Sequence, residues 1–337
     1  MNFFKARSKI GIDLGTESIR VVIKNKGIVI NEPAIIAIEK ESGNIVAVGN
    51  SAKEMIGKTP EKIEALKPLK ESAIADLNAT ELILKDILER IKKDFGIVKP
   101  DVLMNMHIGS TELEKRAVYK LLNDVGVNTA YFIEEPIAAG IGVGLDVYSN
   151  SSFFVVNIGA GSTEVASISE GKIISCSCSR IAGETLDKAI MEYVKKTFNV
   201  EIGKNAAEYI KIAIGTSKPF VKKGIEIKGR DVISGFPKAI NINPLQVYEA
   251  IRDYLNDILE TIRISIQRVP PELWTNIKNY GIVVTGGSAQ IALFNEFLSE
   301  NLGINVLVSK NPLDDVAEGL LLMLSDNEKV KRLKLKM

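Results

Sequence analysis

Histidine and cysteine are nearly missing from this sequence, and their scarcity excludes several kinds of site. His107 is the only histidine among 337 residues. Catalysis by Ser-His or Cys-His pairs and metal sites built on histidine are therefore disfavoured. The two cysteines, Cys176 and Cys178, are one residue apart, a spacing typical of neither a zinc site nor a disulfide framework. We interpret them as two small strand residues in a protein of a reducing compartment.

Long apolar runs and an excess of one charge are missing as well. No apolar stretch reaches the roughly 18 residues of a membrane-spanning helix, and the opening residues MNFFKARSK contain no apolar segment of a signal peptide. The 43 basic and 42 acidic residues give a net charge of +1, so no global field draws the chain to nucleic acid. We expect a cytoplasmic protein that at most lies on a membrane surface.

One pattern of strand, glycine loop and second strand occurs twice. The two copies occupy residues 9–23 and 153–168 and contain the loops DLGTES and NIGAGS. Asp13 and Asn157 hold the same place in the two loops. Because 337 residues exceed one simple core, the repeat predicts a duplicated α/β unit, with a nucleotide between the halves and a phosphate-type loop from each half around it.

A third glycine loop follows the strand in YGIVVTGGSAQ, at residues 280–290. Glycines at a strand end let backbone N–H groups approach a ligand closely. The next residues, 291–303, have the spacing of an amphipathic helix closed by Gly303. Other segments with helical spacing of apolar residues are 111–126, 184–198, 205–215 and 244–271. In the last of these we expect Pro270-Pro271 to end the helix.

The three glycine loops, the duplication and the acidic motif IEEPIAAGIGVG (133–144) together resemble the actin/Hsp70/sugar-kinase superfamily. Within it the chain is similar to the MreB family of bacterial actins over almost its whole length. The similar segments occur in the same order: IGIDLGT, GIVINEPAIIAI, AVGNSAKEMIGKTPEKIEALKPLK, IEEPIAAGIG, AEYIKIAIG, EIKGRDVISGFPKAI, RVPPELW and GIVVTGGSA.

The resemblance implies an α/β, actin-like ATPase fold of two duplicated ribonuclease H-like domains, each with a small subdomain. Residues 1–147 with 315–337 would form domain I, with subdomain IB at about 33–78. Residues 148–314 would form domain II, with subdomain IIB at about 184–248. ATP or ADP with Mg²⁺ would lie in the interdomain cleft.

The first loop is expected, by the same resemblance, to hold the β-phosphate side of the nucleotide. Gly15 would make the turn, and the backbone amides of Thr16, Glu17 and Ser18 would face the phosphate. Asp13 would bind the magnesium through water, since Mg²⁺ keeps most of its hydration shell. The alternative for Asp13 is a turn-capping aspartate.

The second loop would face the γ-phosphate through Gly159, Ala160 and Gly161. The family has three glycines here, so Ala160 is tolerable only if its φ is negative. Ser162 stands where the family has a threonine that orients the attacking water. Asn157 replaces a family aspartate and supplies no negative charge. We therefore expect nucleotide binding to survive and hydrolysis or phosphate release to be slow.

The remaining site residues are also implied by the resemblance. Glu135 would position or activate the water for in-line attack, or would only be a favourable charge at a helix N-terminus. Glu208 and Lys211 would flank the adenosine, or form a plain i,i+3 ion pair. The adenine and α-phosphate would be backed by the third loop: Gly286, Gly287, Ser288 and Ala289.

The function implied is that of a cytoskeletal protein that binds ATP and polymerises into membrane-associated filaments governing cell shape. Its partners would be further copies of itself, in double antiparallel filaments, other MreB-like proteins, and the inner face of the cytoplasmic membrane, with no nucleic acid. Whether it acts as a weak ATPase stays open. The alternatives are a nucleotide-binding scaffold with negligible turnover and a small-molecule kinase, for which no sugar-binding carboxylate is signalled.

Three segments are candidates for contact with the membrane. Phe3-Phe4 carries Lys5 and Arg7 nearby, and the tail at residues 329–337 carries basic residues around two leucines. Such charges attract anionic lipid. Ile97-Val98 lies at the position of the family's membrane loop, with entry into the following strand as the alternative.

Overall fold

The computed structural model describes residues 8–326, and their contacts divide the chain into two compact units. Unit 1 contains the described residues up to Asp146 and those from Asp314 on, and unit 2 is Val147–Leu313. The chain therefore leaves unit 1, forms the whole of unit 2, and returns. Each unit is built on one five-stranded sheet.

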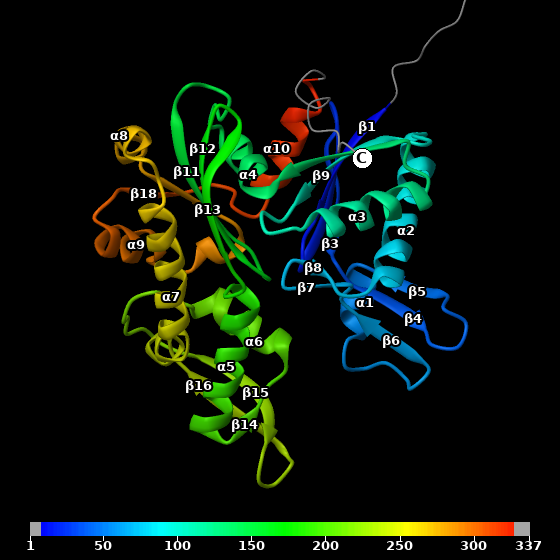
Figure 1. Cartoon of the computed structure of the whole chain (residues 1–337). Helices are drawn as coiled ribbons and strands as arrows, with labels where there is room; N and C mark the ends of the chain where they lie inside the picture. Colours follow the sequence, from blue (N-terminus) through cyan, green and yellow to red (C-terminus); the bar gives the residue numbers. More distant parts are fainter. Residues whose placement is uncertain (1–7, 327–337) are drawn as a thin grey trace, which may run out of the picture. The chain divides into compact units, whose positions relative to one another are not determined.

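The sheet of unit 1 has the strand order β10-β9-β1-β2-β3 (Figure 1). Its strands are β1 (Lys9–Leu14), β2 (Ser18–Ile23), β3 (Gly27–Pro33), β9 (Asp101–Met106) and β10 (Thr129–Glu134). β1 pairs antiparallel with β2 and parallel with β9. The central position of β1 places the loop that follows it at the middle of the sheet's edge, where carboxyl ends of parallel strands meet.

Helices cover both faces of this sheet. The core on one face joins Ile10 and Ile12 of β1 to apolar residues of α2 (Leu77–Phe95) and α3 (Glu112–Asp124). α2 begins where the carboxylate of Asp76 accepts a hydrogen bond from the Ala79 amide at 2.9 Å, and it ends at Gly96, whose φ is 68°.

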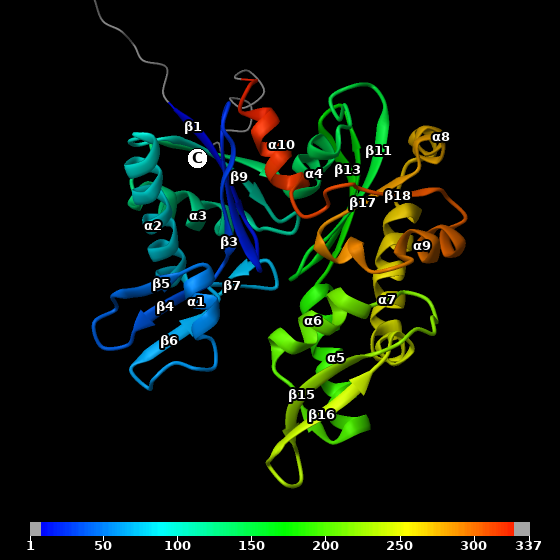
Figure 2. The same cartoon turned by 180° about the vertical axis from the view of Figure 1, so that it is seen from behind.

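On the opposite face lie α4 (Glu135–Val143) and α10 (Asp315–Met323), as Figure 2 shows from behind. Strand side chains alternate between faces, so Gly11 faces α10, and a Cβ on it would lie 3.0 Å from Cβ of Leu320. The two helices cross closely through glycines. A Cβ at Gly142 would lie 1.8 Å from the Asp315 carbonyl oxygen, and one at Gly319 would lie 1.9 Å from that of Ala138.

Unit 1 also contains a smaller three-stranded sheet and a two-stranded one. Their elements are β4 (Ile36–Glu39), β5 (Ile45–Val48), α1 (Asn50–Met55), β6 (Ile63–Leu66), β7 (Leu69–Lys70) and β8 (Ala73–Ile74). Ile35, Ala37 and Ala52 form a small separate core there. This part follows β3 directly and therefore stands close to the first glycine loop.

The sheet of unit 2 has the order β13-β12-β11-β17-β18. Its strands are β11 (Ser152–Ile158), β12 (Thr163–Ser169), β13 (Lys172–Ser179), β17 (Ile282–Thr285) and β18 (Val306–Val308). β11 and β17 run parallel, so the second and third glycine loops leave the same edge of this sheet. Every residue of β11 is buried.

The long helix of unit 2 is α7 (Pro244–Gln267), which begins at an Asn243–Gln246 capping box. Its stripe of apolar residues lies in the core of the unit, as the sequence predicts. The helix ends at Gln267, just before the Pro270-Pro271 pair that was expected to end it. Pro271 also begins α8 (Pro271–Tyr280), because proline suits the first turn of a helix.

The segment after the third loop also differs from the prediction. Residues 287–290 form a short 3₁₀ helix, and Leu293 has a positive φ of 62°. The α-helix therefore begins only at Phe294, and α9 (Phe294–Leu302) ends at Gly303, whose φ is 65°.

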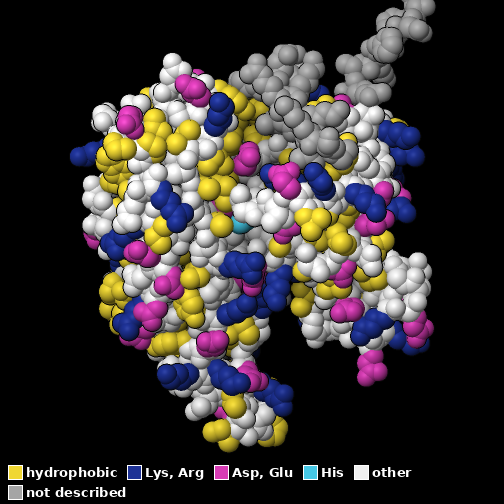
Figure 3. Space-filling view, viewed as in Figure 1, with side chains coloured by type: hydrophobic (Ala, Val, Ile, Leu, Met, Phe, Trp, Pro, Cys, Tyr) yellow, Lys and Arg dark blue, Asp and Glu magenta, His cyan; other side chains and the backbone are white. Residues whose placement is uncertain are grey.

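A three-stranded sheet completes unit 2, with the order β14-β15-β16. Its strands are β14 (Val200–Glu201), β15 (Ile225–Asp231) and β16 (Pro237–Ile242), and beside them lie α5 (Gly183–Phe198) and α6 (Lys204–Ile214). The turn between β15 and β16 exposes Ile233 and Phe236, which are 83% and 72% accessible. Apolar and basic side chains are visible at this end of the hairpin in Figure 3.

Within residues 8–326 no helix is long and apolar enough to cross a membrane. Neither Ile97 nor Val98 enters a strand, since β9 begins at Asp101. Ile97 packs against the core of unit 1, whereas Val98 is 62% exposed. The other two candidate membrane segments, Phe3-Phe4 with its basic neighbours and residues 329–337, lie outside the described residues.

Candidate functional site

The first loop is a tight turn held by backbone hydrogen bonds. The Gly15 amide donates to the Ser18 carbonyl at 3.0 Å, and the Ala34 amide donates to the Glu17 carbonyl at 2.9 Å. Thr16 is buried, and its hydroxyl oxygen accepts a hydrogen bond from the Ser72 amide at 3.0 Å. The turn is therefore fixed both to the start of β4 and to the turn between β7 and β8.

The side chain of Glu17 has a role that the sequence did not reveal. Its carboxylate forms an ion pair with Lys67 and lies 3.7 Å from Nζ of Lys53. Lys53 lies on α1 and Lys67 lies between β6 and β7, 36 and 50 positions from Glu17 in sequence. This loop residue therefore ties the candidate phosphate turn to the smaller part of the unit through charge as well as hydrogen bonds.

Asp13 lies at the carboxyl end of β1 and is only 7% exposed. Burial raises the pKa of its carboxyl to about 6, although Arg20 and Asn105 each lower it. Asn105 on β9 also accepts a hydrogen bond from the Leu14 amide at 3.3 Å and donates one to Oε2 of Glu135 at 3.1 Å. One amide side chain thus connects the two carboxylates to which the resemblance assigns chemistry.

Glu135 begins α4 and stands in its first turn, where the helix dipole favours a negative charge. The structure therefore agrees with the interpretation of Glu135 as a favourable charge at a helix N-terminus. In addition, the contact with Asn105 orients the Glu135 carboxylate toward the end of β1. Asn105 was not singled out from the sequence, although a polar residue in the apolar strand DVLMNM was a signal for it.

The second loop has the same turn as the first. The Gly159 amide donates to the Ser162 carbonyl at 2.9 Å. The start of α5 holds this loop by two backbone hydrogen bonds. The Gly183 amide donates to the Gly159 carbonyl at 3.1 Å, and the Glu184 amide donates to the Ala160 carbonyl at 2.8 Å. Ala160 has no positive φ, so the methyl group that replaces a family glycine is accommodated.

Asn157 and Ser162 are both buried, at 3% and 5% exposure. Directly opposite Asn157 on β12 stands Glu164, which is fully buried. A carboxylate therefore lies beside the second loop although the loop position itself is neutral. The sequence contained a signal for Glu164, because the antiparallel pairing across this turn places Asn157 opposite the residue seven positions later.

The third loop packs directly onto the second. Gly286 has a φ of +86°, and a Cβ on it would lie 2.4 Å from the Ile158 carbonyl oxygen and 2.6 Å from Oδ1 of Asn157. The hydroxyl of Ser288 donates to the Gly159 carbonyl at 2.9 Å. Gly287 and Ala289 stand in the 3₁₀ helix beside these residues. The structure thus brings two of the predicted loops together within unit 2.

The predicted pair on α6 has an additional partner. Nζ of Lys211 lies 2.7 Å from Oδ1 of Asp187 and donates to the Gly183 carbonyl at 3.0 Å. Burial raises the pKa of Asp187, whereas Lys211 lowers it and Glu208 raises it further. Lys211 is therefore held against the start of α5, next to the second loop, and Glu208 lies close enough to act on the same carboxylate.

The donors in unit 1 suit a magnesium ion that arrives with its own water and phosphate ligands. Among residues 8–326 no three His, Cys, Asp or Glu side chains form a cluster that could hold a metal alone. Mg²⁺ prefers oxygen donors and often takes only one or two carboxylates from the protein, the rest coming from waters and substrate phosphates. Asp13 and Glu135, bridged by Asn105, supply such oxygens.

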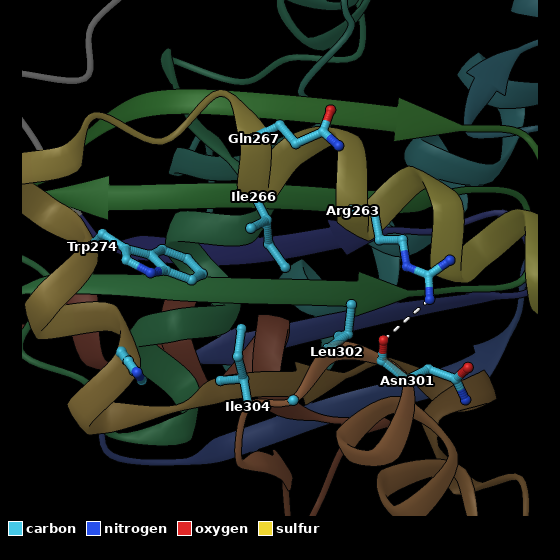
Figure 4. A pocket seen from close by; sticks show the side chains of 9 residues that line it. Arg263, Ile266, Gln267, Trp274, Asn301, Leu302 and Ile304 are labelled. Atoms are coloured by element: carbon cyan, nitrogen blue, oxygen red, sulfur yellow. Dashed lines mark hydrogen bonds between the residues drawn. The ribbon is translucent and has the colours of Figure 1, made fainter.

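A separate cavity of about 300 Å³ lies in unit 2, between the end of α7, α8 and the end of α9 (Figure 4). Trp274, Leu302 and Ile304 line it together with Arg263, which donates to the Asn301 carbonyl at 3.1 Å. Among the described residues that line this cavity, none belongs to the three glycine loops and none is a carboxylate. It is therefore distinct from the glycine loops.

Solved structures show which fold these two units define. MreB5 of Spiroplasma citri bound to AMPPNP superposes with a TM-score of 0.91 at 28% identity, covering 97% of this chain and 98% of that one. A MamK double helical filament superposes with a TM-score of 0.80 at 20% identity, covering 95% and 99%. The chain has the actin-like fold.

Sequence relatives define the family within this fold. The family model described as MreB/Mbl protein matches residues 7–332. Cell shape-determining protein Mbl of Bacillus subtilis (strain 168) is 38% identical over 327 residues, covering 97% of this chain and 98% of the relative. Cell shape-determining protein MreB of Escherichia coli (strain K12) is 37% identical over 316 residues, covering 92% and 91%. The chain belongs to the MreB/Mbl family.

Proposed function

We propose that this chain is a cytoskeletal actin homologue that binds ATP or ADP with magnesium and assembles with copies of itself into filaments that govern cell shape. One observation carries the nucleotide part of the proposal. The same turn, closed by an amide-to-carbonyl hydrogen bond of 3.0 Å in one unit and 2.9 Å in the other, follows a central strand in each unit. Each turn offers backbone amides, which are suited to phosphate oxygens.

In this proposal the residues of unit 1 hold the magnesium side of the nucleotide. Asp13 would take the hydrated ion, which supplies charge neutralisation to the phosphates when it is bound. Asn105 keeps the carboxylate of Glu135 oriented, so that Glu135 can position a water for attack on the γ-phosphate. Positioning is the main requirement, since phosphoryl transfer needs little covalent help from the protein.

The residues of unit 2 would face the other phosphates and the adenosine. The backbone of Gly159, Ala160 and Gly161 would approach the γ-phosphate, and the hydroxyl of Ser162 would orient the water. Lys211, fixed by Asp187, and Glu208 would flank the adenosine. The third loop, from Gly286 on, would back the base.

Slow turnover is part of the proposal because Asn157 is neutral. An amide can hydrogen-bond to a water but adds no negative charge with which to order the magnesium waters. A scaffold that binds nucleotide with negligible turnover is therefore the second candidate function. Phosphate release from the wild type and from Asn157→Asp separates the two candidates from each other. A faster variant supports a weakened catalyst, whereas equal rates contradict the assigned role of Asn157.

Filament formation is tested by electron microscopy of the purified chain with ADP, ATP and a non-hydrolysable analogue. We expect filaments with ATP and the analogue, arranged as antiparallel pairs. Filaments in all three nucleotide states support the scaffold. No filaments in any state contradict the proposal. Mixing with a second MreB-like protein tests whether related proteins copolymerise.

We further propose that the filaments lie at the inner face of the cytoplasmic membrane. Among the described residues Val98 supports this, because it is a largely exposed apolar residue in the loop before β9. Co-sedimentation with liposomes tests the idea. We expect Val98→Asp to reduce binding, and an unchanged bound fraction for this variant would remove Val98 from the contact.

A further inference from the structure

The cavity at the end of α7 has an apolar floor. Ile266 of α7, Leu302 of α9 and Ile304 form this floor, and Ile304 is only 9% exposed. Figure 4 shows the three aliphatic side chains between the ring of Trp274 and the guanidinium of Arg263. The volume of about 300 Å³ lies at the lower end of the range for ligand pockets, roughly 300–1,000 Å³. The space therefore suits a compact ligand.

The charged residues that line this cavity are both cations, Arg263 and Lys278. Lys278 follows Trp274 by four residues on α8, so the two share one face of that helix. Within the part of the chain that the structure describes, Lys278 forms no ion pair. Arg263 is held in place by the Asn301 carbonyl, to which its Nη2 atom donates at 3.1 Å.

One carboxylate near the cavity competes for Arg263. Oε2 of Glu260 lies 3.8 Å from Nη1 of Arg263, and the side chains of the two residues are 58% and 43% exposed. An exposed pair at this distance contributes little, and it leaves the charge of Lys278 untouched. The lining therefore has a surplus of positive charge beside an apolar floor.

This combination favours an anion that carries an apolar group. A carboxylate or sulfonate accepts hydrogen bonds from ammonium and guanidinium donors, and a ring or a short alkyl chain packs on the indole of Trp274 and the aliphatic floor. The chain's own ends have the wrong charge for such a place, because residues 1–7 and 327–337 contain more basic than acidic side chains.

We propose that the cavity between the ends of α7, α8 and α9 is a binding site for a small amphiphilic anion. The ligand is a carboxylate or sulfonate whose apolar body lies against Trp274 and the aliphatic floor, while Lys278 and Arg263 contact its charged group. None of the described residues that line the cavity belongs to a glycine loop. The site is therefore separate from the proposed nucleotide site and does not depend on it.

The test uses the fact that Trp274 is the only tryptophan in the chain. The dye 8-anilino-1-naphthalenesulfonate is titrated into the purified full chain, and energy transfer from Trp274 to the dye is recorded. We expect saturable transfer from one dye per chain. Octanoate should displace the dye at a concentration at least about threefold lower than its neutral analogue 1-octanol, because only octanoate can use the two cations. Excess ADP should leave the transfer unchanged.

Variants then locate the charge. Lys278→Gln should raise the Kd of the dye about threefold, and the double variant Lys278→Gln with Arg263→Gln about tenfold. The matched control is Arg252→Gln, because Arg252 is an exposed arginine of α7 that lies 3.6 Å from Asp253 and does not line the cavity. This variant should keep the wild-type Kd. Circular dichroism confirms that each variant is folded.

Three results would overturn the inference. The first is transfer that does not saturate. The second is displacement by 1-octanol at the same concentration as by octanoate, a comparison that needs only the wild type. The third is a Kd of the double variant equal to that of Arg252→Gln. Displacement of the dye by ADP would also contradict it, because the dye would then occupy the nucleotide site.

Discussion

The two glycine loops share a backbone and differ in charge. Each closes with an amide-to-carbonyl hydrogen bond of about the same length, and each has its key polar residue at the same place. Across the hairpin, however, Asp13 faces Arg20 in unit 1, whereas Asn157 faces Glu164 in unit 2. The shape of such a loop is therefore set by the turn, and the charges placed on it can change independently.

The loops also differ in what holds them. Side chains add charged contacts to the backbone hydrogen bonds of the first one, since Thr16 accepts a hydrogen bond from Ser72 and Glu17 pairs with two lysines. The second one has no such ion pair among its described contacts and is held mainly by main-chain contacts, through the start of α5 and the close approach of Gly286, with one hydrogen bond from the Ser288 hydroxyl. We therefore expect the first loop to be loosened when charges are removed, and the second loop to be destabilised when volume is added.

The largest expected effect comes from adding a methyl group to the third loop where it packs onto the second. Gly286→Ala places a Cβ at 2.4 Å from the Ile158 carbonyl oxygen at a φ of +86°. We expect a loss of about 2–4 kcal/mol in the free energy of unfolding, from overpacking and backbone strain together. Urea denaturation measures it. Gly159→Ala is the matched control, because its nearest neighbour would be 3.6 Å away, and it should cost less than about 1 kcal/mol. Equal losses would contradict the main-chain account.

The next prediction tests the buried charge of the first loop through pH. The pKa of Asp13 is raised from 3.8 to about 6, so the folded state binds the proton more tightly than the unfolded one. The wild type should therefore lose stability as pH rises from about 4 to about 6. Asp13→Asn removes this titration, so its free energy of unfolding should gain about 1–3 kcal/mol relative to the wild type between pH 4 and pH 7. A pH-independent difference between the two proteins would show that the carboxyl is not destabilised by burial.

A third prediction makes the two loops alike. Asn157→Asp places a second carboxylate directly opposite the buried Glu164. Two such groups cannot both be charged without a penalty, so we expect a loss of about 1–2 kcal/mol at pH 7. Chemical denaturation of a double-mutant cycle with Glu164→Gln isolates the pair. The double variant should recover most of the loss, and additive effects would mean that the two side chains do not interact.

The smallest effect is expected at Glu17. Glu17→Gln removes the charge that pairs with Lys53 and Lys67, but these side chains are partly exposed, so we expect less than about 1 kcal/mol. Hydrogen exchange at the Ser72 amide gives a local reading, because this amide donates to the loop at Thr16. Faster exchange in the variant supports charge-held coupling. The control is Glu39→Gln, at the end of β4, where the carboxylate accepts a hydrogen bond from Ser42; it should leave the exchange unchanged.

Much of the fold could be predicted because short, continuous segments of the sequence indicate its elements. The repeated strand–loop–hairpin pattern and the ordered MreB-like segments predict an actin-like fold, which the solved structures confirm. Helix ends were less predictable, since Pro271 both stops one helix and starts another. Arg20 and Glu164 became evident only with the register of the hairpins. The pairing of Glu17 with Lys67 joins residues 50 positions apart, and no spacing in the sequence signals such a contact.

The close crossing of α4 and α10 has a consequence for the order in which the protein can form. α10 fits against α4 through Gly142 and Gly319 and covers one face of the β1 sheet. During synthesis, however, α10 leaves the ribosome only after all of Val147–Leu313. The first unit to be translated must therefore wait with an open sheet face, whereas the second is a continuous segment that can fold as soon as it has emerged. The unit whose synthesis starts second is therefore the first that can be finished.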